Sequence, residues 1–514
     1  MDILDQIVAQ RRKDIAKAGA ALGLRIPAVR ERPVTPFLAR KGVILEIKRA
    51  SPSKGDIAPA LDAAETAAAY ARAGASAISV LTESHWFKGS LADLLSACGA
   101  ADRYAAETKT QPPAILRKDF LLSADEIEVA YLCGADAVLL IARILDTERM
   151  VTMAKKCGEL GITALIELRL DEDLRKLAEV VKVVSTKSVV CGVNARDLKD
   201  FSIDLLTPAA LLSEIRSIAG GDVRVVFESG IRTADAAAFA GSLGFSAMLM
   251  GEAAAKNPAD AGELVSAFVS ARETANARAW SRYAQKLQAK RGRSDRTPFV
   301  KICGLTNEAD ALKAASLGAD FLGFIFYEKS PRKVNPNDLP QIISALREAG
   351  LREKVCLVGV IVEPGSQDAH DALAAFERGD IDMIQLHGAD CFRSFTQKEI
   401  PHYAVVNVST EEDLKRIDEI RLLGEPRILI DAKVGRQIGG TGERIAGLLV
   451  EKVSQKTKLW LAGGITAENA DEIISRFEPE LIDVASGVET CAGIKDHARM
   501  ERLFANIRRS RPNQ

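Results

Sequence analysis

The sequence predicts an α/β protein built from two tandem (β/α)8 barrels joined by a short helical linker. Short apolar runs rich in Val, Ile and Leu alternate with alanine-rich segments of helical spacing, which is typical of parallel strands connected by helices. Each half of the chain offers eight such runs, and 514 residues are about twice the ~250 that one such barrel needs. Periodicity alone does not show closure, so an open doubly wound sheet is the structural alternative.

The apolar runs give the expected strands in order. A helical pattern around Ile3, Ile7 and Ile15 predicts an extra helix ahead of the first strand. The strands of the first half are expected at 43–48, 76–81, 114–120, 136–141, 163–168, 189–194, 223–228 and 246–251. Those of the second half are expected at 298–303, 320–326, 355–362, 381–386, 403–408, 427–431, 458–464 and 481–486.

The two halves meet in an Ala-, Arg- and Lys-rich segment that ends in the polar run KRGRSDRTP. We expect a helix that closes the first barrel, followed by a short loop, with the boundary near Asp295. The predicted domains are therefore a first barrel at 1–258, a helical linker at 259–297 and a second barrel at 298–514.

Composition and charge exclude several classes of function. Lys and Arg number 69 against 70 Asp and Glu, and no long run of one sign marks a surface for nucleic acid. The first residues include acids and lack the apolar core of a secretory signal, and no stretch approaches the ~20 apolar residues that span a bilayer. Eight scattered cysteines form no metal-binding spacing. We expect a cytoplasmic protein with no metal, no cofactor, and no nucleic-acid or membrane partner.

Charged and polar side chains stand at the carboxyl ends of the expected strands of the first half. A charge inside a strand that is covered on both sides is expensive, whereas the carboxyl ends form the mouth where barrel enzymes keep their sites. Any one of these residues could be a solvated loop charge, but five strand ends converge on one mouth. They are Glu46 with Lys48, Lys118, Glu167, Asn194 with Arg196, and Glu228 with Ser229.

The second half carries a different set at its strand ends. Cys303, Arg332, His387 and Asp431 follow four of its strands, and no carboxylate ends the first strand. A thiol there can act as a base where neighbouring donors favour the thiolate, and a carboxyl group across the mouth can donate a proton. The alternative for Cys303 is a buried core thiol. The glycine-rich segment 439–442 could close over the site.

Glycines follow the seventh and eighth strands of both halves, in ESGI and MGE and again in AGGI and ASGVE. Glycine lets backbone N–H groups approach an anion at a helix N-terminus, and barrel enzymes use these two loops to hold phosphate. The alternative is that the glycines merely turn the chain. That alternative would suffice for one pair of glycine loops, but it explains less well why both halves have such a pair. The predicted phosphate ligands are Gly230, Gly251, Gly463, Gly464, Ser486 and Gly487.

These motifs carry a resemblance to two families. The first half resembles indole-3-glycerol-phosphate synthase through EIKRASPSKG, LRKDF, IEL, NARDL and ESGI. The second half resembles phosphoribosylanthranilate isomerase through KICGLT, GFIFYEKSPR, IQLHG, IDAK, GGTG, LAGGI and DVASGVE. The resemblance implies two consecutive steps of tryptophan biosynthesis, acting on small sugar-phosphate derivatives of anthranilate.

The synthase resemblance implies a role for each strand-end residue of the first half. Lys118 would be the general acid of ring closure and Glu167 the acid/base of the later dehydration, while Lys48 would hold the substrate carboxylate and Glu46 would support this network. The product would be indole glycerol phosphate, with carbon dioxide and water released. The remaining substrate-binding residues would be Ser51, Phe120, Asn194, Arg196, Glu228 and Ser229.

The isomerase resemblance implies an Amadori rearrangement in the second half. Asp431 would protonate the ribose ring oxygen, and Cys303 would remove the C2 proton from the resulting Schiff base. Arg332 would bind the anthranilate carboxylate, because its planar fork suits that anion, and His387 would contact the substrate.

The sequence leaves three departures from the family patterns and several alternative functions open. Ala195, Glu252 and Glu363 depart from the commoner family patterns and bear only on fine details of binding. An aldolase or sugar-phosphate epimerase shares the double phosphate motif, but the carboxylates near Lys118 do not suit a Schiff-base lysine. A histidine-pathway isomerase would resemble a pattern with Asp at the first strand, where this chain has Cys303. A barrel pair with one inactive half is the remaining alternative.

Overall fold

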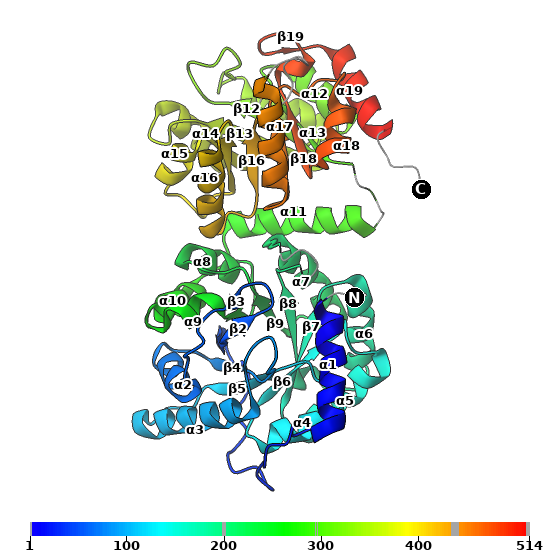
Figure 1. Ribbon diagram of the computed structural model, residues 1–514. Helices are drawn as coiled ribbons and strands as arrows, with labels where there is room; N and C mark the ends of the chain where they lie inside the picture. Colours follow the sequence, from blue (N-terminus) through cyan, green and yellow to red (C-terminus); the bar gives the residue numbers. More distant parts are fainter. Residues whose placement is uncertain (1–2, 198–201, 293–294, 296, 433–440, 510–514) are drawn as a thin grey trace. The chain divides into compact units, whose positions relative to one another are not determined.

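The structure is a computed structural model that describes residues 3–197, 202–292, 295, 297–432 and 441–509. The chain forms two compact units, Met1–Glu273 and Thr274–Gln514. Within the described residues, each unit contains eight parallel strands that close into a barrel with helices between them (Figure 1). The expected pair of (β/α)8 barrels is confirmed. The expected domain bounds at 258 and 297 stay predictions.

The first barrel closes because its first strand pairs with both its second and its last. Gly42 lies in register with Ala247 on one side, and Ile44 with Ala77 on the other. The strands lie where the apolar runs predicted them. They are β1 (Gly42–Ile47), β4 (Ala77–Leu81), β5 (Ala114–Lys118), β6 (Ala137–Ile141), β7 (Thr163–Leu168), β8 (Val189–Asn194), β9 (Arg224–Glu228) and β10 (Ala247–Met250).

Side chains that favour helix N-termini begin several helices of this unit. Asp62 accepts a hydrogen bond from the backbone N–H of Glu65, and Ser90 accepts one from Asp93. The helices around the barrel are α2 (Ala63–Arg72), α3 (Leu91–Thr108), α4 (Ala124–Leu132), α5 (Thr147–Glu159), α6 (Asp171–Val181), α7 (Leu206–Ala219), α8 (Ala234–Ser242), α9 (Glu252–Lys256) and α10 (Ala261–Ser270).

The extra helix expected at the N-terminus is α1 (Ile3–Ala18). Its Arg11 is 4% exposed, and its Nη2 lies 2.6 Å from Glu126 Oε1 and 3.1 Å from Asp119 Oδ2. Removing one partner of such a buried pair would leave an uncompensated charge, so the pair fixes the helix to the barrel. A small hairpin, β2 (Ala50–Ser51) and β3 (Gly55–Asp56), follows β1.

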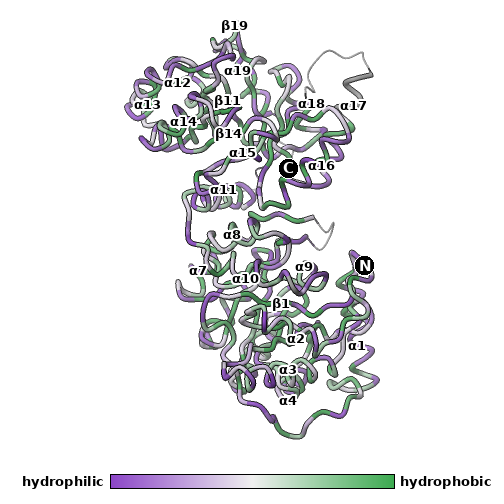
Figure 2. The backbone as a smooth tube through the Cα atoms, turned by 90° about the vertical axis from the view of Figure 1, so that its left-hand side faces the viewer, coloured by the Kyte–Doolittle hydropathy of each residue, from purple (hydrophilic) through white to green (hydrophobic). Residues whose placement is uncertain are grey.

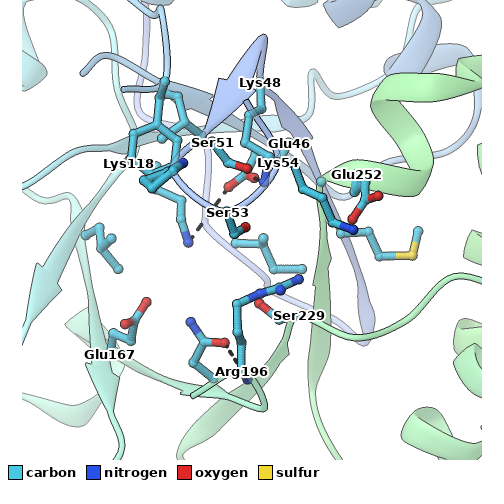
Figure 3. A pocket seen from close by; sticks show the side chains of 18 of the residues that line it. Glu46, Lys48, Ser51, Ser53, Lys54, Lys118, Glu167, Arg196, Ser229 and Glu252 are labelled. Carbon is cyan, nitrogen blue, oxygen red and sulfur yellow. Dashed lines mark hydrogen bonds and ion pairs between the residues drawn. The ribbon is translucent and has the colours of Figure 1, made fainter. Parts of the chain in front are cut away.

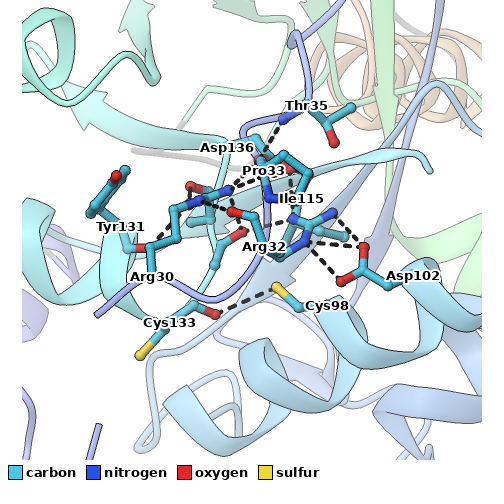
Figure 4. A network of polar contacts seen from close by, with 12 residues as sticks. Arg30, Arg32, Pro33, Thr35, Cys98, Asp102, Ile115, Tyr131, Cys133 and Asp136 are labelled. Atoms are coloured by element: carbon cyan, nitrogen blue, oxygen red, sulfur yellow. Dashed lines mark hydrogen bonds and ion pairs between the residues drawn. The ribbon is translucent and has the colours of Figure 1, made fainter. Parts of the chain in front are cut away.

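The segment between α1 and β1 is held by a buried cluster of ion pairs at the N-terminal end of β6 (Figure 4). Asp136 is fully buried and accepts from Arg30 Nη2 at 2.6 Å and from Arg32 Nη1 at 2.9 Å. It also accepts the backbone N–H groups of Thr35 and Ile115. These four bonds satisfy the buried carboxylate, so the cluster ties the segment to two strands.

The second barrel closes in the same way, with Phe299 in register with Leu481. Its strands are β11 (Phe299–Cys303), β12 (Phe321–Ile325), β13 (Cys356–Ile361), β14 (Met383–His387), β15 (His402–Asn407), β16 (Ile428–Asp431), β17 (Trp460–Ala462) and β18 (Leu481–Val484). Its helices are α12 (Glu308–Leu317), α13 (Leu339–Glu348), α14 (Gln367–Glu377), α15 (Ala389–Ser394), α16 (Glu411–Leu422), α17 (Thr441–Ser454), α18 (Ala470–Phe477) and α19 (His497–Arg509). A hairpin of β19 (Glu489–Cys491) and β20 (Ile494–Lys495) follows β18.

The segment expected as a linker contains α10, which belongs to the first unit, and α11 (Ala275–Gly292), which belongs to the second. Trp280 and Tyr283 of α11 are buried against Trp460, with ring centroids 5.8 and 5.3 Å from it. Tyr283 also packs against Phe299 and Phe321 with its ring tilted relative to theirs. Because these three partners begin β17, β11 and β12, α11 covers the N-terminal end of its barrel.

Each barrel places apolar side chains between its strands and its helices. Along the outer helices, hydrophilic and hydrophobic stretches alternate, as expected where one face packs inward (Figure 2). Within the described ranges, no helix is both long and apolar enough to cross a bilayer. All eight cysteines are free thiols.

Candidate active sites

The mouth of the first barrel contains a cluster of lysines and carboxylates from different strands. Lys118 ends β5, and its Nζ lies 3.2 Å from Glu228 Oε2 on β9 and 3.8 Å from Glu46 Oε2 on β1. Lys48 donates to the other oxygen of Glu46 at 2.6 Å. Glu167 is the second-last residue of β7 and lines the same cavity, which has a volume of about 1280 Å³ with its open mouth included.

The charges in this cluster set one another's ionisation. Burial alone would lower the pKa of Lys118, but attraction to Glu228, Glu46 and Glu167 outweighs it and raises the pKa. Burial and the neighbouring carboxylate of Glu228 raise the pKa of Glu167 to about 7, against a smaller lowering by Lys118. In the free site, Lys118 is therefore an ammonium at neutral pH, and it lies beside a carboxyl group that can exchange a proton near neutral pH.

Glycines make room for this cluster. A Cβ on Gly251 would lie 2.4 Å from Glu46 Oε1 and 2.7 Å from Lys48 Nζ, so a larger residue would displace that ion pair. A Cβ on Gly192 would lie 2.0 Å from Glu228 Oε1. Ser229 adopts a left-handed backbone with φ of 70°, which is rare for a residue with a side chain and is typical of functional sites.

Cations occupy another side of the cavity. Figure 3 shows Arg196 and Ser229 across the open space from Lys118, with Glu252 nearby. Glu252 accepts from Arg232 at 3.1 Å and from Lys256 at 3.0 Å. Burial raises the pKa of Glu252, but the hydrogen bond from Lys256 and the charges of Arg232 and Lys256 lower it further than burial raises it. This side can attract a substrate anion such as phosphate.

The mouth of the second barrel collects the strand-end residues of the second half. Cys303, His387 and Asp431 end β11, β14 and β16, and they line one cavity of about 1500 Å³ with its open mouth included. Burial lowers the pKa of His387 more than the nearby charge of Asp431 raises it, which favours a neutral imidazole.

Arg332 lines this cavity and is held from the side by Glu489. Its Nε lies 2.9 Å from Glu489 Oε1, and its Nη2 lies 2.8 Å from Oε2. Lys495 donates to the same carboxylate at 2.8 Å. Gly304 leaves space for the arginine stem, because a Cβ there would lie 2.8 Å from Arg332 Cδ. The hairpin β19–β20 thus fixes the guanidinium beside the cavity.

The glycine loops after β17 and β18 approach each other closely. Gly463 and Gly464 have φ values of 106° and 68°, in the region that favours glycine. A Cβ on Gly487 would lie 1.9 Å from the carbonyl oxygen of Ile465, so no side chain fits at that position. Ser486 lines the cavity beside them. Backbone N–H groups can therefore surround an anion between the two loops.

Comparison with known proteins assigns each unit to a family. The family model described as indole-3-glycerol phosphate synthase matches residues 4–265, and that described as N-(5'-phosphoribosyl)anthranilate isomerase matches residues 300–506. A tryptophan biosynthesis protein of Phytophthora nicotianae is 30% identical, over 96% of this chain and 94% of its own. The chain belongs to both families. We call Met1–Glu273 the synthase unit and Thr274–Gln514 the isomerase unit, so the chain is a bifunctional enzyme.

Two further relatives are similar over different lengths. A multifunctional tryptophan biosynthesis protein of Schizosaccharomyces pombe is 32% identical over 95% of this chain, which spans 64% of that protein's length. A crystal structure of phosphoribosylanthranilate isomerase from Thermotoga maritima is 32% identical and covers 41% of this chain and 98% of its own, with a TM-score of 0.35.

The structure brings most of the expected site residues into the two cavities. Two expected residues are not among those that line the cavities, namely Glu228, which contacts Lys118, and Gly487, which follows Ser486 in the chain. Gly439 and Gly440 of the expected closing loop lie outside the described residues. The synthase cavity is lined by Glu46, Lys48, Ser51, Lys118, Phe120, Glu167, Asn194, Arg196, Ser229, Gly230 and Gly251. The isomerase cavity is lined by Cys303, Arg332, His387, Asp431, Gly463, Gly464 and Ser486.

Several residues in or beside these cavities were not expected from the sequence. Ile3 and Ile7 of α1 line the synthase cavity, as do Lys54 and Arg232. In the isomerase unit, Asp483 lines the cavity. A signal for Asp483 was present, because a charge inside an apolar strand run is costly and calls for a partner. Of the departures from family patterns, Ala195 is buried, Glu363 is exposed, and Glu252 lies in the synthase cavity.

Proposed function

We propose that the two units catalyse consecutive steps of tryptophan biosynthesis with the residues gathered in the two mouths. The isomerase unit converts phosphoribosylanthranilate to carboxyphenylamino-deoxyribulose phosphate. The synthase unit then closes the indole ring and releases carbon dioxide and water. The observation that supports the proposal is that each cavity has its own acidic and basic side chains beside glycines that follow two of its strands.

In the isomerase step, Asp431 donates a proton to the ring oxygen of the ribose, which opens the ring to a Schiff base. The thiolate of Cys303 then takes the proton from C2, and the electrons of that C–H bond form the C1=C2 bond of an enolamine. Tautomerisation of the enolamine gives the ketone product. Arg332 binds the anthranilate carboxylate with the part of its guanidinium that faces away from Glu489.

In the synthase step, Lys118 protonates the ketone oxygen while the aromatic ring attacks that carbon. Its high pKa keeps the ammonium charged, and Glu228 and Glu46 orient it toward the cavity. Loss of carbon dioxide restores an unsaturated ring, and Glu167, with a pKa of about 7, transfers the proton that lets water leave. Lys48 holds the substrate carboxylate beforehand.

A coupled assay tests this proposal. Purified protein is given phosphoribosylanthranilate, the loss of its anthranilate-type fluorescence reports the first step, and chromatographic detection of indole glycerol phosphate reports the second. We expect both signals in sequence. Accumulation of the first product without indole formation, or no loss of fluorescence, would contradict the assignment of the corresponding unit.

We also propose that the enzyme works in the cytoplasm and does not bind nucleic acid. The free thiols of all eight cysteines suit a reducing compartment, and the near balance of 69 basic and 70 acidic residues offers little attraction for a phosphate backbone. Fractionation of cells and a filter-binding assay with DNA and RNA test the two statements.

A further inference from the structure

A lysine is buried in the barrel interior next to Cys303. Lys301 and Cys303 are two residues apart on β11, so both side chains point to the same face of the strand. Lys301 is 0% exposed, and its Nζ lies 2.5 Å from Asp483 Oδ2 on β18 and donates to Gln385 Oε1 on β14 at 2.7 Å. Tyr403 on β15 donates to the same oxygen of Gln385. One layer of this barrel is therefore polar.

A polar layer at this depth is costly. Barrel interiors are usually filled by branched apolar side chains, and taking two charges out of water costs several kcal/mol per ion before their attraction repays it. Asp483 keeps one oxygen, Oδ1, that has no hydrogen-bond partner among the described residues. An apolar layer would stabilise the unit at least as well. We therefore expect the buried charges of Lys301 and Asp483 to have a role in the chemistry of the site.

The thiol of Cys303 and the stem of Lys301 lie against the same glycine. Cys303 is in register with Gly323 on β12. A Cβ on Gly323 would lie 2.6 Å from Cys303 Sγ and 3.1 Å from Lys301 Cε. The two side chains thus share the space that the missing Cβ leaves.

Counting donors separates Lys301 from the other buried lysine nearby. Lys495 Nζ contacts Glu489 and the carbonyl oxygens of Cys303 and Ala485, which occupies its three donors. Among the described residues, Lys301 uses two of its three, on Asp483 and Gln385. Its third N–H is available to the sulfur of Cys303.

The groups around the thiol of Cys303 have opposite effects on its pKa. Burial raises the pKa of Cys303, the charges of Lys301 and Lys495 lower it, and Asp483 raises it. Arg332 and Tyr403 also interact electrostatically with the thiol. The net pKa is raised, so a base at this position depends on the cations that counter burial.

We propose that Lys301 is a positioning residue of the isomerase site, whose ammonium, oriented by Asp483 and Gln385, stabilises the thiolate of Cys303. This inference rests on the proposed role of Cys303 as the base. When the thiolate takes the C2 proton it becomes a neutral thiol, and Lys301 keeps its own proton throughout. The lysine therefore supports the base without carrying a proton itself.

The test measures the thiolate directly in the full-length protein. The rate at which iodoacetamide alkylates Cys303 is followed against pH by mass spectrometry of its peptide, in the wild type and in Lys301→Met and Asp483→Asn. Cys491 is exposed in the same unit and serves as an internal reference. Lys301→Met should shift the alkylation profile of Cys303 to higher pH by about one unit. This shift corresponds to about tenfold less thiolate at a given neutral pH. Asp483→Asn should move the profile down, because the amide oxygen can still accept from Lys301 but no longer carries the charge that raises the pKa of the thiol.

Opposite shifts distinguish this inference from a structural role. Both substitutions break the same ion pair, so a purely structural effect would move the two profiles in the same direction or not at all, and either result would overturn the proposal. Reaction at the buried Cys391 reports unfolding. If Lys301→Met unfolds, the alkylation profile of Asp483→Asn alone tests the inference. An unchanged profile, or one shifted to higher pH, would contradict it. Isomerase activity of Cys303→Ala tests the base assignment separately.

Discussion

Removing α11 should destabilise the isomerase unit far more than removing a linker segment would. Two fragments test this, one starting at Thr274 and one starting at Arg296. The second lacks α11 and leaves the rings of Trp460, Phe299 and Phe321 without their cover. The comparison also decides between a boundary near Asp295 and one at the junction of the two compact units.

The expected loss follows from the two largest buried side chains of α11. Trp280 is 0% and Tyr283 6% exposed. Replacing a buried aromatic side chain by alanine typically costs about 3–5 kcal/mol, so the pair represents about 6–10 kcal/mol. The free energy of unfolding of a domain is only about 5–15 kcal/mol. At about 2–4 °C per kcal/mol for a unit of this size, the melting temperature should fall by at least about 12 °C.

Circular dichroism melting of both fragments, with isomerase activity measured beside it, gives the answer. In the longer fragment, Trp280→Ala alone should cost about 3–5 kcal/mol. The matched control is Gln285→Ala, because Gln285 is exposed on the same helix and its replacement should stay within about 0.5 kcal/mol. If the fragment starting at Arg296 melts within a few degrees of the longer one, the reasoning about α11 is wrong.

Three further predictions concern the chemistry. Lys118→Ala should lower synthase turnover by at least ~10²–10⁴-fold and leave isomerisation near wild type, and a variant that keeps most synthase turnover would defeat the general-acid assignment. The synthase kcat/KM should fall as pH rises through about 7, where Glu167 loses its proton, and Glu167→Gln should lack this limb of the pH profile. Cys303→Ala and Asp431→Ala should each stop the isomerase and spare the synthase; melting temperatures measured beside activity separate lost chemistry from lost folding.

The strands could be predicted because burial on both sides demands apolar residues throughout. The run 189–194 is an example, since it coincides with β8. The position of α11 could not be predicted in the same way. Trp280 and Tyr283 stand one helical turn apart and mark a buried face, but the spacing within a helix does not say which barrel that face covers.

A site residue could be predicted where it stands at the end of an apolar strand run. It could not be predicted where its position depends on contact with a segment far away in the sequence. Lys118 and Asp431 follow apolar runs, so their position in a mouth follows from the fold. The pairing of Arg332 with Glu489 spans 157 positions of sequence and leaves no local trace. Lys301 could have been found, because it is a charge inside an apolar strand and must therefore have a buried partner.

The pairing of β1 with β10 has a consequence for how the protein is made. About 200 residues separate Gly42 from its partner Ala247. At the ~5–20 residues per second of ribosomal synthesis, about 10–40 s pass between the synthesis of β1 and that of β10, the strand that pairs with one of its two edges. During that time the nascent sheet has open edges that can pair with any other unfinished chain. In the finished enzyme the barrel is closed and these edges are paired, so we expect open strand edges to favour aggregation during synthesis rather than afterwards.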